Sequence, residues 1–196
     1  DLGSFSAYRP HVLDLNGDGV PDLFFSYAGP MGAYAYALLG KGDGSFVAVK
    51  DGQAVIGEST SHAGYLFNFA DVNGDGVVDV LLTYAGQHGA FAYAWRGLGD
   101  GSYASYNEGK PILEQTQLGG LGYYQAMPTD LLGRGIADVI FATGHDTGLF
   151  AYAWRNPRDP AENLLASIQS PVAPAITLGY ETLVRGAHVR DSGAMA

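Results

Sequence analysis

The sequence predicts an all-β protein built from repeated four-stranded antiparallel sheets. Two observations lead to this fold class. The chain repeats itself with a period of about 58 residues, and each repeat consists of short strand-like segments separated by glycine-rich turns. The composition agrees, because the 196 residues include 29 glycines, 13 tyrosines and 9 phenylalanines. Aromatic residues favour strands and glycine favours tight turns, so many short strands are expected.

An acidic loop and the segment that follows it define the repeat. The loop reads DLNGDGVPD at Asp14–Asp22 and DVNGDGVVD at Asp71–Asp79, and the later segment GAYAYALLGKGDGSF matches GAFAYAWRGLGDGSY. A third copy begins at Asp130 with DLLGRGIAD, and a partial fourth copy begins near Tyr180. We therefore expect a single repeat array over residues 1–196. Its units lie at about 5–50, 64–112, 121–170 and 178–191, the last being only the start of a fourth unit.

Each unit is expected to contain four strands, as the second unit illustrates. Tyr65–Ala70 leads into the acidic loop, and Val80–Ala85 follows it as a continuous apolar run, typical of a strand covered on both faces. Ala90–Trp95 alternates alanine with aromatic residues, so its two faces differ. A weaker fourth strand follows the turn at Gly99–Gly101. Four antiparallel strands per unit, with no helix between units, are typical of β-propeller blades.

The spacing of oxygen-bearing side chains in the first two loops predicts calcium sites. Ca²⁺ takes about six to eight oxygen ligands, and the loops place carboxylates and an amide at alternate positions with glycines where the backbone turns sharply. The expected ligands, with each valine contributing its carbonyl oxygen, are Asp14, Asn16, Asp18, Val20 and Asp22 in the first loop and Asp71, Asn73, Asp75, Val77 and Asp79 in the second. A metal-free hairpin turn is the alternative, but such a turn needs no third and fourth acidic or amide side chain.

The third loop, Asp130–Asp138, departs from this pattern. Leu132 and Arg134 replace the asparagine and the central aspartate of the other loops. Because a guanidinium cannot coordinate a cation, we predict that this loop is metal-free. Arg134 is expected to pair with Asp130 or Asp138 in place of the metal.

The loop D-x-N-G-D-G-x-x-D followed by G-D-G-[ST]-[FY] resembles the FG-GAP or VCBS repeat. Such repeats occur in integrin α-subunit propellers, in the Psathyrella-type fungal lectin and in many secreted bacterial proteins. The resemblance implies the blades of a calcium-loaded propeller, with the calcium loop joining the first two strands of each blade. Members of the family bind carbohydrate or protein ligands, or serve as scaffolds of polysaccharide-degrading enzymes.

Three units and a fragment are fewer than the roughly four to eight blades of a propeller. We therefore expect either continuation in a longer propeller or closure of a ring by self-association. The aromatic stripe of the third strands is expected to pack between units against the alanines of the neighbouring unit. A sugar-stacking surface is the alternative, with Trp95 and Trp154 as the best candidates; the stripe's other members are Tyr36, Tyr93 and Tyr152.

Charge and hydropathy exclude several function classes. The net charge is −10 and there is no basic run, which argues against a nucleic-acid partner. No apolar run approaches the roughly 18 residues that a membrane-spanning helix needs. Calcium sites that stay filled suit an extracellular or cell-surface location, and a chain that starts at Asp1 without a signal peptide fits a mature or excised piece.

No motif in the sequence indicates catalysis. There is no cysteine, no nucleophile elbow and no phosphate-binding glycine loop. His62, His88 and His145 have no metal-ligand spacing and are expected to lie at the surface of loops.

The leading hypothesis is a non-catalytic, calcium-stabilised, lectin-like recognition or adhesion module for extracellular carbohydrate or protein. Its ligand contacts would fall on the loops Gly29–Gly32, Gly86–Gly89 and Gly144–Gly148. Two alternatives remain open. The chain could belong to a secreted polysaccharide lyase or another enzyme whose catalytic residues lie elsewhere, or it could be a structural or assembly module of a larger surface protein or toxin.

Overall fold

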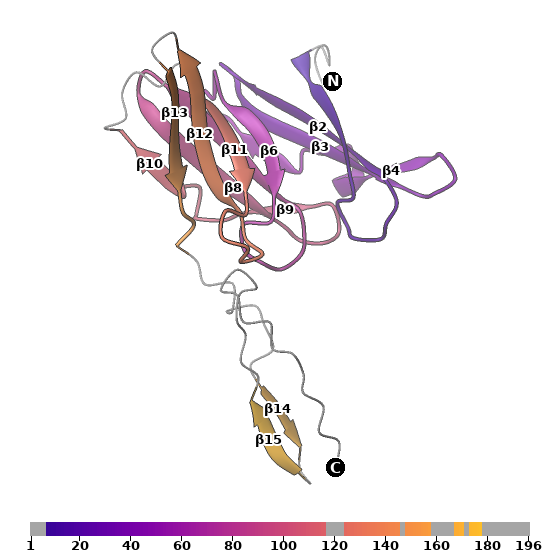
Figure 1. Cartoon of the computed structure of the whole chain (residues 1–196). Helices are drawn as coiled ribbons and strands as arrows, with labels where there is room; N and C mark the ends of the chain where they lie inside the picture. Colours follow the sequence, from indigo (N-terminus) through magenta and orange to yellow (C-terminus); the bar gives the residue numbers. More distant parts are fainter. Residues whose placement is uncertain (1–6, 117–123, 146–147, 158–166, 171–172, 178–196) are drawn as a thin grey trace.

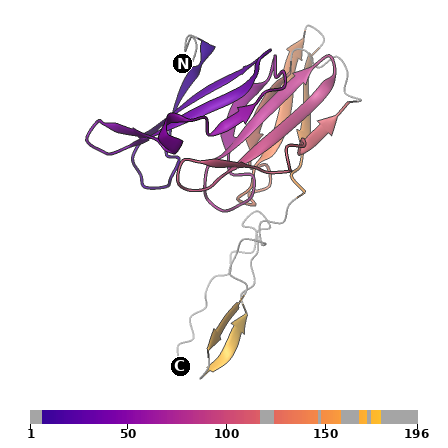
Figure 2. The ribbon, with the colours of Figure 1, turned by 180° about the vertical axis from the view of Figure 1, so that it is seen from behind.

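The structure is a computed structural model, and it confirms the all-β prediction. It describes residues 7–116, 124–145, 148–157, 167–170 and 173–177. The described strands form antiparallel sheets, and three of these sheets follow one another side by side in chain order (Figure 1). Figure 2 shows the same succession from behind. This is the arrangement of successive β-propeller blades.

The first sheet begins as a meander in which each strand pairs with the next. Its strands are β1 (Arg9–Leu13), β2 (Asp22–Gly29), β3 (Gly32–Gly40), β4 (Phe46–Ala48) and β5 (Ile56–Glu58). The fourth position of the sheet is divided, because β4 pairs with the end of β3 while β5 pairs with its beginning. A single 3-10 turn at Val49–Gly52 lies between these two short strands. The sequence predicted one fourth strand, and the structure has two short strands, β4 and β5, in its place.

The second sheet repeats the first. Its strands are β6 (Leu66–Ala70), β7 (Asp79–Gly86), β8 (Gly89–Gly97), β9 (Tyr103–Ser105) and β10 (Leu113–Gln115). β9 and β10 both pair with β8, so the divided outer position recurs. Gly89 shows why this arrangement needs glycine: its φ is 113°, and a Cβ there would overlap the carbonyl oxygen of Gln115 on the neighbouring β10.

The third sheet has three described strands, β11 (Gln125–Thr129), β12 (Asp138–His145) and β13 (Gly148–Trp154). A separate hairpin pairs β14 (Ser167–Ser170) with β15 (Ala173–Thr177). The expected start of a fourth unit at 178–191 lies outside the described residues.

The core between the first and second sheets joins an alanine-rich face to an aromatic face. Ala33, Ala35 and Ala37 of β3 are buried, and they belong to one cluster with Trp95 of β8 and the half-buried Tyr93. Trp95 is only 5% exposed, so it is a core residue and not a surface platform for sugars.

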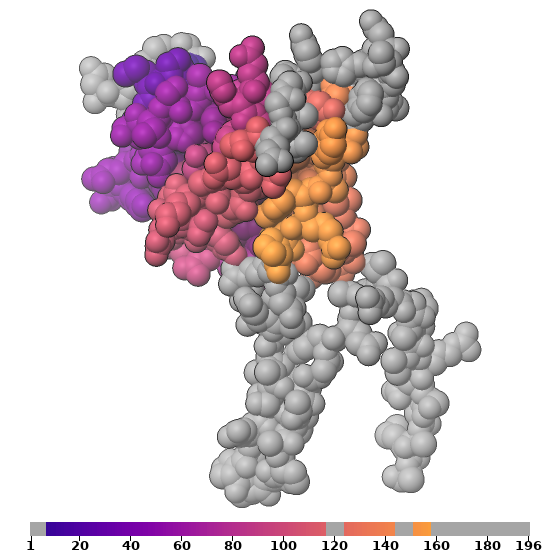
Figure 3. Space-filling model, turned by 90° about the vertical axis from the view of Figure 1, so that its left-hand side faces the viewer, coloured from indigo at the N-terminus to yellow at the C-terminus, as the bar shows by residue number. Residues whose placement is uncertain are grey.

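The core between the second and third sheets follows the same rule. Ala90, Ala92 and Ala94 on the other face of β8 pack against Phe141 of β12, with Trp154 of β13 partly buried beside them. The expected packing of the aromatic stripe against alanines is therefore confirmed for Tyr93, Trp95 and Trp154. It is wrong for Tyr152, which is 44% exposed, because Phe141 of the second strand packs against the alanines at this interface instead. Figure 3 shows the outer surfaces of the three sheets adjoining in chain order.

Candidate metal centres

The three acidic loops connect the first two strands of each sheet and lie along one edge of the array. They follow β1, β6 and β11, and in Figure 1 they lie at the lower ends of these strands. The predicted ligands therefore come from two successive loops at this edge.

In the first loop, three side chains turn inward onto the loop's own backbone. The two carboxylate oxygens of Asp14 accept hydrogen bonds from the amides of Gly17 (2.8 Å) and Gly19 (2.9 Å). Asp18 Oδ1 accepts from the Val20 amide at 2.8 Å, and Asn16 Nδ2 donates to Asp18 Oδ2 at 2.8 Å. Gly17 and Gly19 have φ values of 76° and 80°, a conformation that glycine adopts without strain.

The second loop has the same internal geometry. Asp71 accepts from the amides of Gly74 (2.6 Å) and Gly76 (2.8 Å). Asn73 Nδ2 donates to Asp75 Oδ2 at 2.8 Å, and Asp75 Oδ1 accepts from the Val77 amide at 2.9 Å. The shared sequence thus produces the same local structure in both loops.

The last aspartate of each loop has a second role that the sequence reasoning missed. Asp22 is fully buried, and its two oxygens accept from the amide of Leu15 (2.7 Å) at the start of the loop and from that of Gly40 (2.8 Å) at the end of β3. It thereby fastens the loop to the third strand of its sheet. The only signal of this contact in the sequence is that the two repeats carry glycine at equivalent positions, 40 and 97.

Asp79 repeats this arrangement in the second loop. Its oxygens accept from the amides of Val72 (2.9 Å) and Gly97 (2.8 Å). Burial raises the pKa of Asp79 to about 6, the two backbone hydrogen bonds oppose this rise, and the nearby charges of Asp75 and Asp71 add to it.

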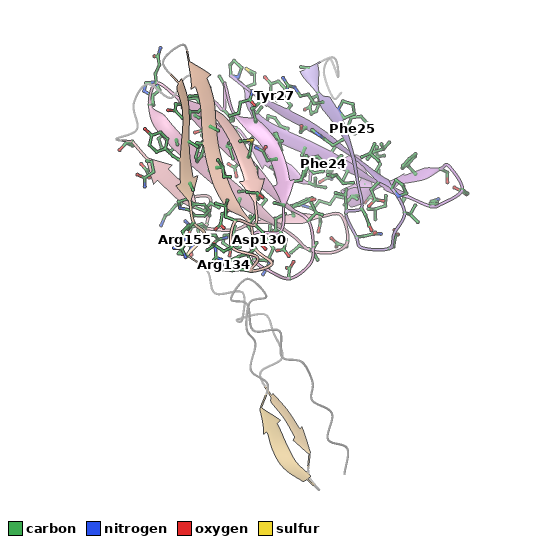
Figure 4. All side chains as sticks on the ribbon, in the orientation of Figure 1. Phe24, Phe25, Tyr27, Asp130, Arg134 and Arg155 are labelled. Carbon is green, nitrogen blue, oxygen red and sulfur yellow. The ribbon has the colours of Figure 1, made fainter. Side chains whose placement is uncertain are left out.

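The third loop carries its own cation. Arg134 Nη2 donates to Asp138 Oδ1 at 2.7 Å and to the carbonyl oxygen of Asn156 at 3.1 Å. Asp130 accepts from the backbone amides of Arg134 (2.9 Å) and Gly135 (2.7 Å). The predicted pairing of Arg134 with an aspartate of its loop is confirmed, and the partner is Asp138. Figure 4 shows Arg134 and Asp130 together at this edge.

Asn156 is a site residue that the sequence reasoning missed. It is 7% exposed, and its Nδ2 donates to the carbonyl oxygens of Val72 (2.8 Å) and Ala137 (3.2 Å). The Ala137 amide in turn donates to the carbonyl oxygen of Asp71 at 2.7 Å. The second and third loops are therefore joined by one backbone hydrogen bond and by the side chain of Asn156.

A family model described as FG-GAP-like repeat matches residues 14–82. The match includes both nine-residue acidic loops and the strands between them. No curated protein matches the chain.

The chain is similar to the solved structure of a lectin of Agrocybe aegerita, described as specifically recognising non-reducing terminal N-acetylglucosamine. The sequences are 24% identical and the TM-score is 0.48. The likeness covers 77% of this chain and 39% of the lectin chain, so this chain spans well under half of that protein.

The side chains of the first two acidic loops suit a hard divalent cation in their chemistry. Each loop offers three carboxylates and one amide oxygen, and a carboxylate oxygen that accepts one hydrogen bond keeps a second lone pair for a metal. The described part of the chain holds no ready-made group of three or more acidic or histidine side chains at metal-binding distance. The only ion pair between described residues is in the third loop. The first two loops thus have the appropriate oxygens but no described cationic side chain.

Two further predictions can be placed. Gly29–Gly32 and Gly86–Gly89 are tight hairpin connections at the edge opposite the acidic loops, whereas Gly144–Gly148 contains residues outside the described part of the chain. The surface position expected for His62 is wrong: its side chain is 6% exposed, and Nδ1 lies 2.6 Å from the carbonyl oxygen of Thr60. Its ring packs against Tyr65 and Tyr93, and this aromatic cluster is why the histidine is buried.

No helix among the described residues is long and apolar enough to cross a membrane.

Proposed function

We propose that this protein is a calcium-stabilised β-propeller recognition module that binds extracellular carbohydrate or protein and performs no catalysis itself. The FG-GAP-like repeat and the succession of antiparallel sheets support the propeller part of the proposal. Calcium and the extracellular location are inferred from the chemistry of the loops, and the ligand class is inferred from the resemblance of the repeats to FG-GAP repeats.

The single observation that carries the calcium proposal is the contrast between the third loop and the other two. Arg134 places a positive charge 2.7 Å from the buried carboxylate of Asp138. The first two loops have an aspartate, Asp18 or Asp75, at the position equivalent to Arg134. A loop that has lost an acidic ligand has gained an internal cation, which is the expected pattern where the acidic loops receive their positive charge from a bound ion.

The proposed ligands are those of the two complete loops. Asp14, Asn16, Asp18, Asp22 and the carbonyl oxygen of Val20 would hold one ion. The equivalent set Asp71, Asn73, Asp75, Asp79 and Val77 would hold the second. A bound ion would supply positive charge that offsets the repulsion between neighbouring carboxylates. Its role would be structural, because Asp22 and Asp79 tie each loop to the end of the third strand.

Calcium binding is tested by titration calorimetry on the full chain. We expect about two ions per chain, because two loops have the full donor set, and one ion for Asp75→Ala, which removes a ligand oxygen. Asp43→Ala is the control, because Asp43 lies in an exposed turn outside the loops and accepts from Ser45. A wild-type chain that binds no calcium, or an Asp75→Ala variant that still binds two ions, would refute the site assignment.

Thermal melting measures the structural effect of the ion. Calcium at 100 times its Kd adds about 2.7 kcal/mol per site to the free energy of unfolding. For a chain of this size, each kcal/mol corresponds to roughly 2–4 °C in Tm. Melting curves that coincide in calcium and in chelator would contradict a structural role.

Recognition is tested by screening the calcium-loaded chain against glycans and extracellular proteins, with turnover of polysaccharides measured in parallel. Saturable binding without turnover is expected. Cleavage of a polysaccharide by this chain would replace the proposal with an enzymatic function, and the absence of both binding and turnover would favour a structural or assembly module.

A further inference from the structure

Each of the first two acidic loops contains an asparagine followed directly by glycine. The pairs are Asn16–Gly17 and Asn73–Gly74, and the sequence holds no other pair of this kind. Asparagine in this context is chemically labile, because glycine has no Cβ to hinder its backbone nitrogen from reaching the side-chain carbonyl carbon of the asparagine. The two loops therefore carry a covalent reactivity that metal binding does not explain.

The hydrogen bonds of the first loop suit this reaction. The attacking nitrogen belongs to Gly17, and its N–H donates to Asp14 Oδ1 at 2.8 Å, so this carboxylate is placed to accept the proton. The Asp18 amide donates to Asn16 Oδ1 at 3.1 Å and stabilises the negative charge that develops on that oxygen. Asn16 Nδ2, the nitrogen that leaves, donates to Asp18 Oδ2 at 2.8 Å. The loop thus supplies a base and an oxyanion donor for a reaction of its own backbone.

The second loop has the same contacts but a different exposure. The Gly74 amide donates to Asp71 Oδ1 at 2.6 Å, and the Asp75 amide donates to Asn73 Oδ1 at 2.9 Å. Asn73 is only 3% exposed, whereas Asn16 is half-buried. Exposure therefore separates two sites that have similar internal geometry.

Contacts with the third loop explain why Asn73 is buried. The Ala137 amide donates to the carbonyl oxygen of Asp71 at 2.7 Å, and Asn156 Nδ2 donates to that of Val72 at 2.8 Å. These bonds hold the two residues just before Asn73 against the third unit. A side chain held in this way reacts only when its loop opens locally, so its rate falls with the population of the open form.

We propose that Asn16 is a site of spontaneous deamidation and that Asn73 is protected from the same reaction by the third loop. The Gly17 nitrogen bonds to Cγ of Asn16, the Cγ–Nδ2 bond breaks, and the proton from the Gly17 nitrogen leaves with Nδ2 as ammonia. The product is a cyclic imide. Water then opens this ring at either of its carbonyl carbons, which gives aspartate or isoaspartate. Water is the only co-reactant, and nothing is oxidised or reduced.

The reaction alters a loop that is proposed to bind calcium, and this part of the inference rests on the proposed function. Isoaspartate carries the backbone through its former side chain and so adds one methylene to the main chain. That insertion shifts the spacing of the oxygens between Asp14 and Asp22. A bound ion would hold Asp14 and Asn16 Oδ1 and so keep both from reacting. The first calcium site is therefore lost irreversibly when the chain stands without calcium, while the second persists.

The test is peptide mapping by mass spectrometry after incubation of the full chain at neutral pH in a calcium chelator. Deamidated Asn16 should accumulate first, partly as isoaspartate, which a protein isoaspartyl methyltransferase labels. Asn73 should react at least about tenfold more slowly, which corresponds to an opening free energy of about 1.4 kcal/mol. In urea the difference should vanish, because both asparagines precede the same residues, Gly-Asp-Gly-Val.

Gly17→Ala has a matched control in Gly19→Ala. Both glycines have positive φ, 76° and 80°, and a Cβ at either position meets no atom within 4 Å beyond its chain neighbours, so the two variants carry similar backbone strain. Gly17→Ala should lose the deamidation of Asn16 over the same period, and Gly19→Ala should retain it. The proposal is overturned if Asn16 stays intact, if Asn16 and Asn73 react at the same rate in the folded chain, or if the two variants deamidate alike.

The same incubation with excess calcium tests the link to the metal site. Deamidation of Asn16 should be suppressed, and chain deamidated beforehand should bind about one ion instead of about two in titration calorimetry. A calcium-independent rate that is still faster at Asn16 than at Asn73 would keep the modification site and refute only its link to calcium.

Discussion

Replacing Arg134 by alanine tests the idea that the third loop is stabilised by its own cation. Asp138 is fully buried, and the side chain of Arg134 is 15% exposed. The substitution would leave the Asp138 carboxylate with two backbone donors, Asn156 at 2.8 Å and Leu131 at 3.2 Å. Breaking a buried ion pair by removing one partner costs about 3–5 kcal/mol. Because two donors remain, we expect the lower end of that range.

The assay is urea unfolding in the presence of a calcium chelator, so that no ion can replace the guanidinium. A loss of about 3 kcal/mol corresponds to a fall in Tm of roughly 6–12 °C. Arg96→Ala is the control for removal of an exposed arginine, and its effect should stay within about 0.5 kcal/mol. Adding Asp138→Asn to Arg134→Ala should recover part of the loss, because the buried charge is then gone. Equal unfolding free energies for Arg134→Ala and the wild type would refute the reasoning.

Three further substitutions follow from the described contacts. Phe24 is fully buried between the first two sheets, so Phe24→Ala should lower the unfolding free energy by about 3–5 kcal/mol, whereas Phe46→Ala, at a site 43% exposed, should have little effect in the same urea titration. Gly89→Ala should destabilise more than Gly44→Ala, because both glycines have positive φ but only at Gly89 would a Cβ meet backbone atoms; equal losses would contradict this. The pKa of His11 is lowered from 6.5 by burial and then by Arg9, so the stability contributed by neutral His11 is complete above pH 6.5 and is lost as the pH falls through the lowered pKa. His11→Asn, the residue of the second repeat, should therefore flatten the fall in stability below pH 6.5, and an unchanged pH profile would count against this origin.

The sequence predicted those parts of the fold that depend on repetition and alternation. The recurrence of the acidic loop gave the length of the repeat unit. The alternation in Ala90–Trp95 correctly placed alanine and aromatic residues on opposite faces of a strand. These features are local, because strand geometry sends successive side chains to opposite faces wherever the strand lies.

The features that sequence reasoning missed depend on contacts between distant residues. Asp22 looks like the last ligand of its loop, yet its carboxylate also binds the amide of Gly40, 18 residues further along. Asn156 lies 84 residues from Val72, the carbonyl of which it binds. The divided outer strand depends likewise on how the chain returns to β3 after the turn at Val49–Gly52. No local spacing encodes such partners, since they are set by the way complete sheets stack.

The hydrogen bonds made by Asn156 also affect how the second and third units unfold. In a repeat protein, stability is the sum of terms within each unit and coupling terms between neighbours. Asn156 and the Ala137 amide place two hydrogen bonds in such a coupling term, and both end on backbone carbonyls of the second loop, those of Val72 and Asp71. Fraying of the third sheet therefore removes hydrogen-bond partners from the loop of the second, so these two units should melt cooperatively and not one after the other.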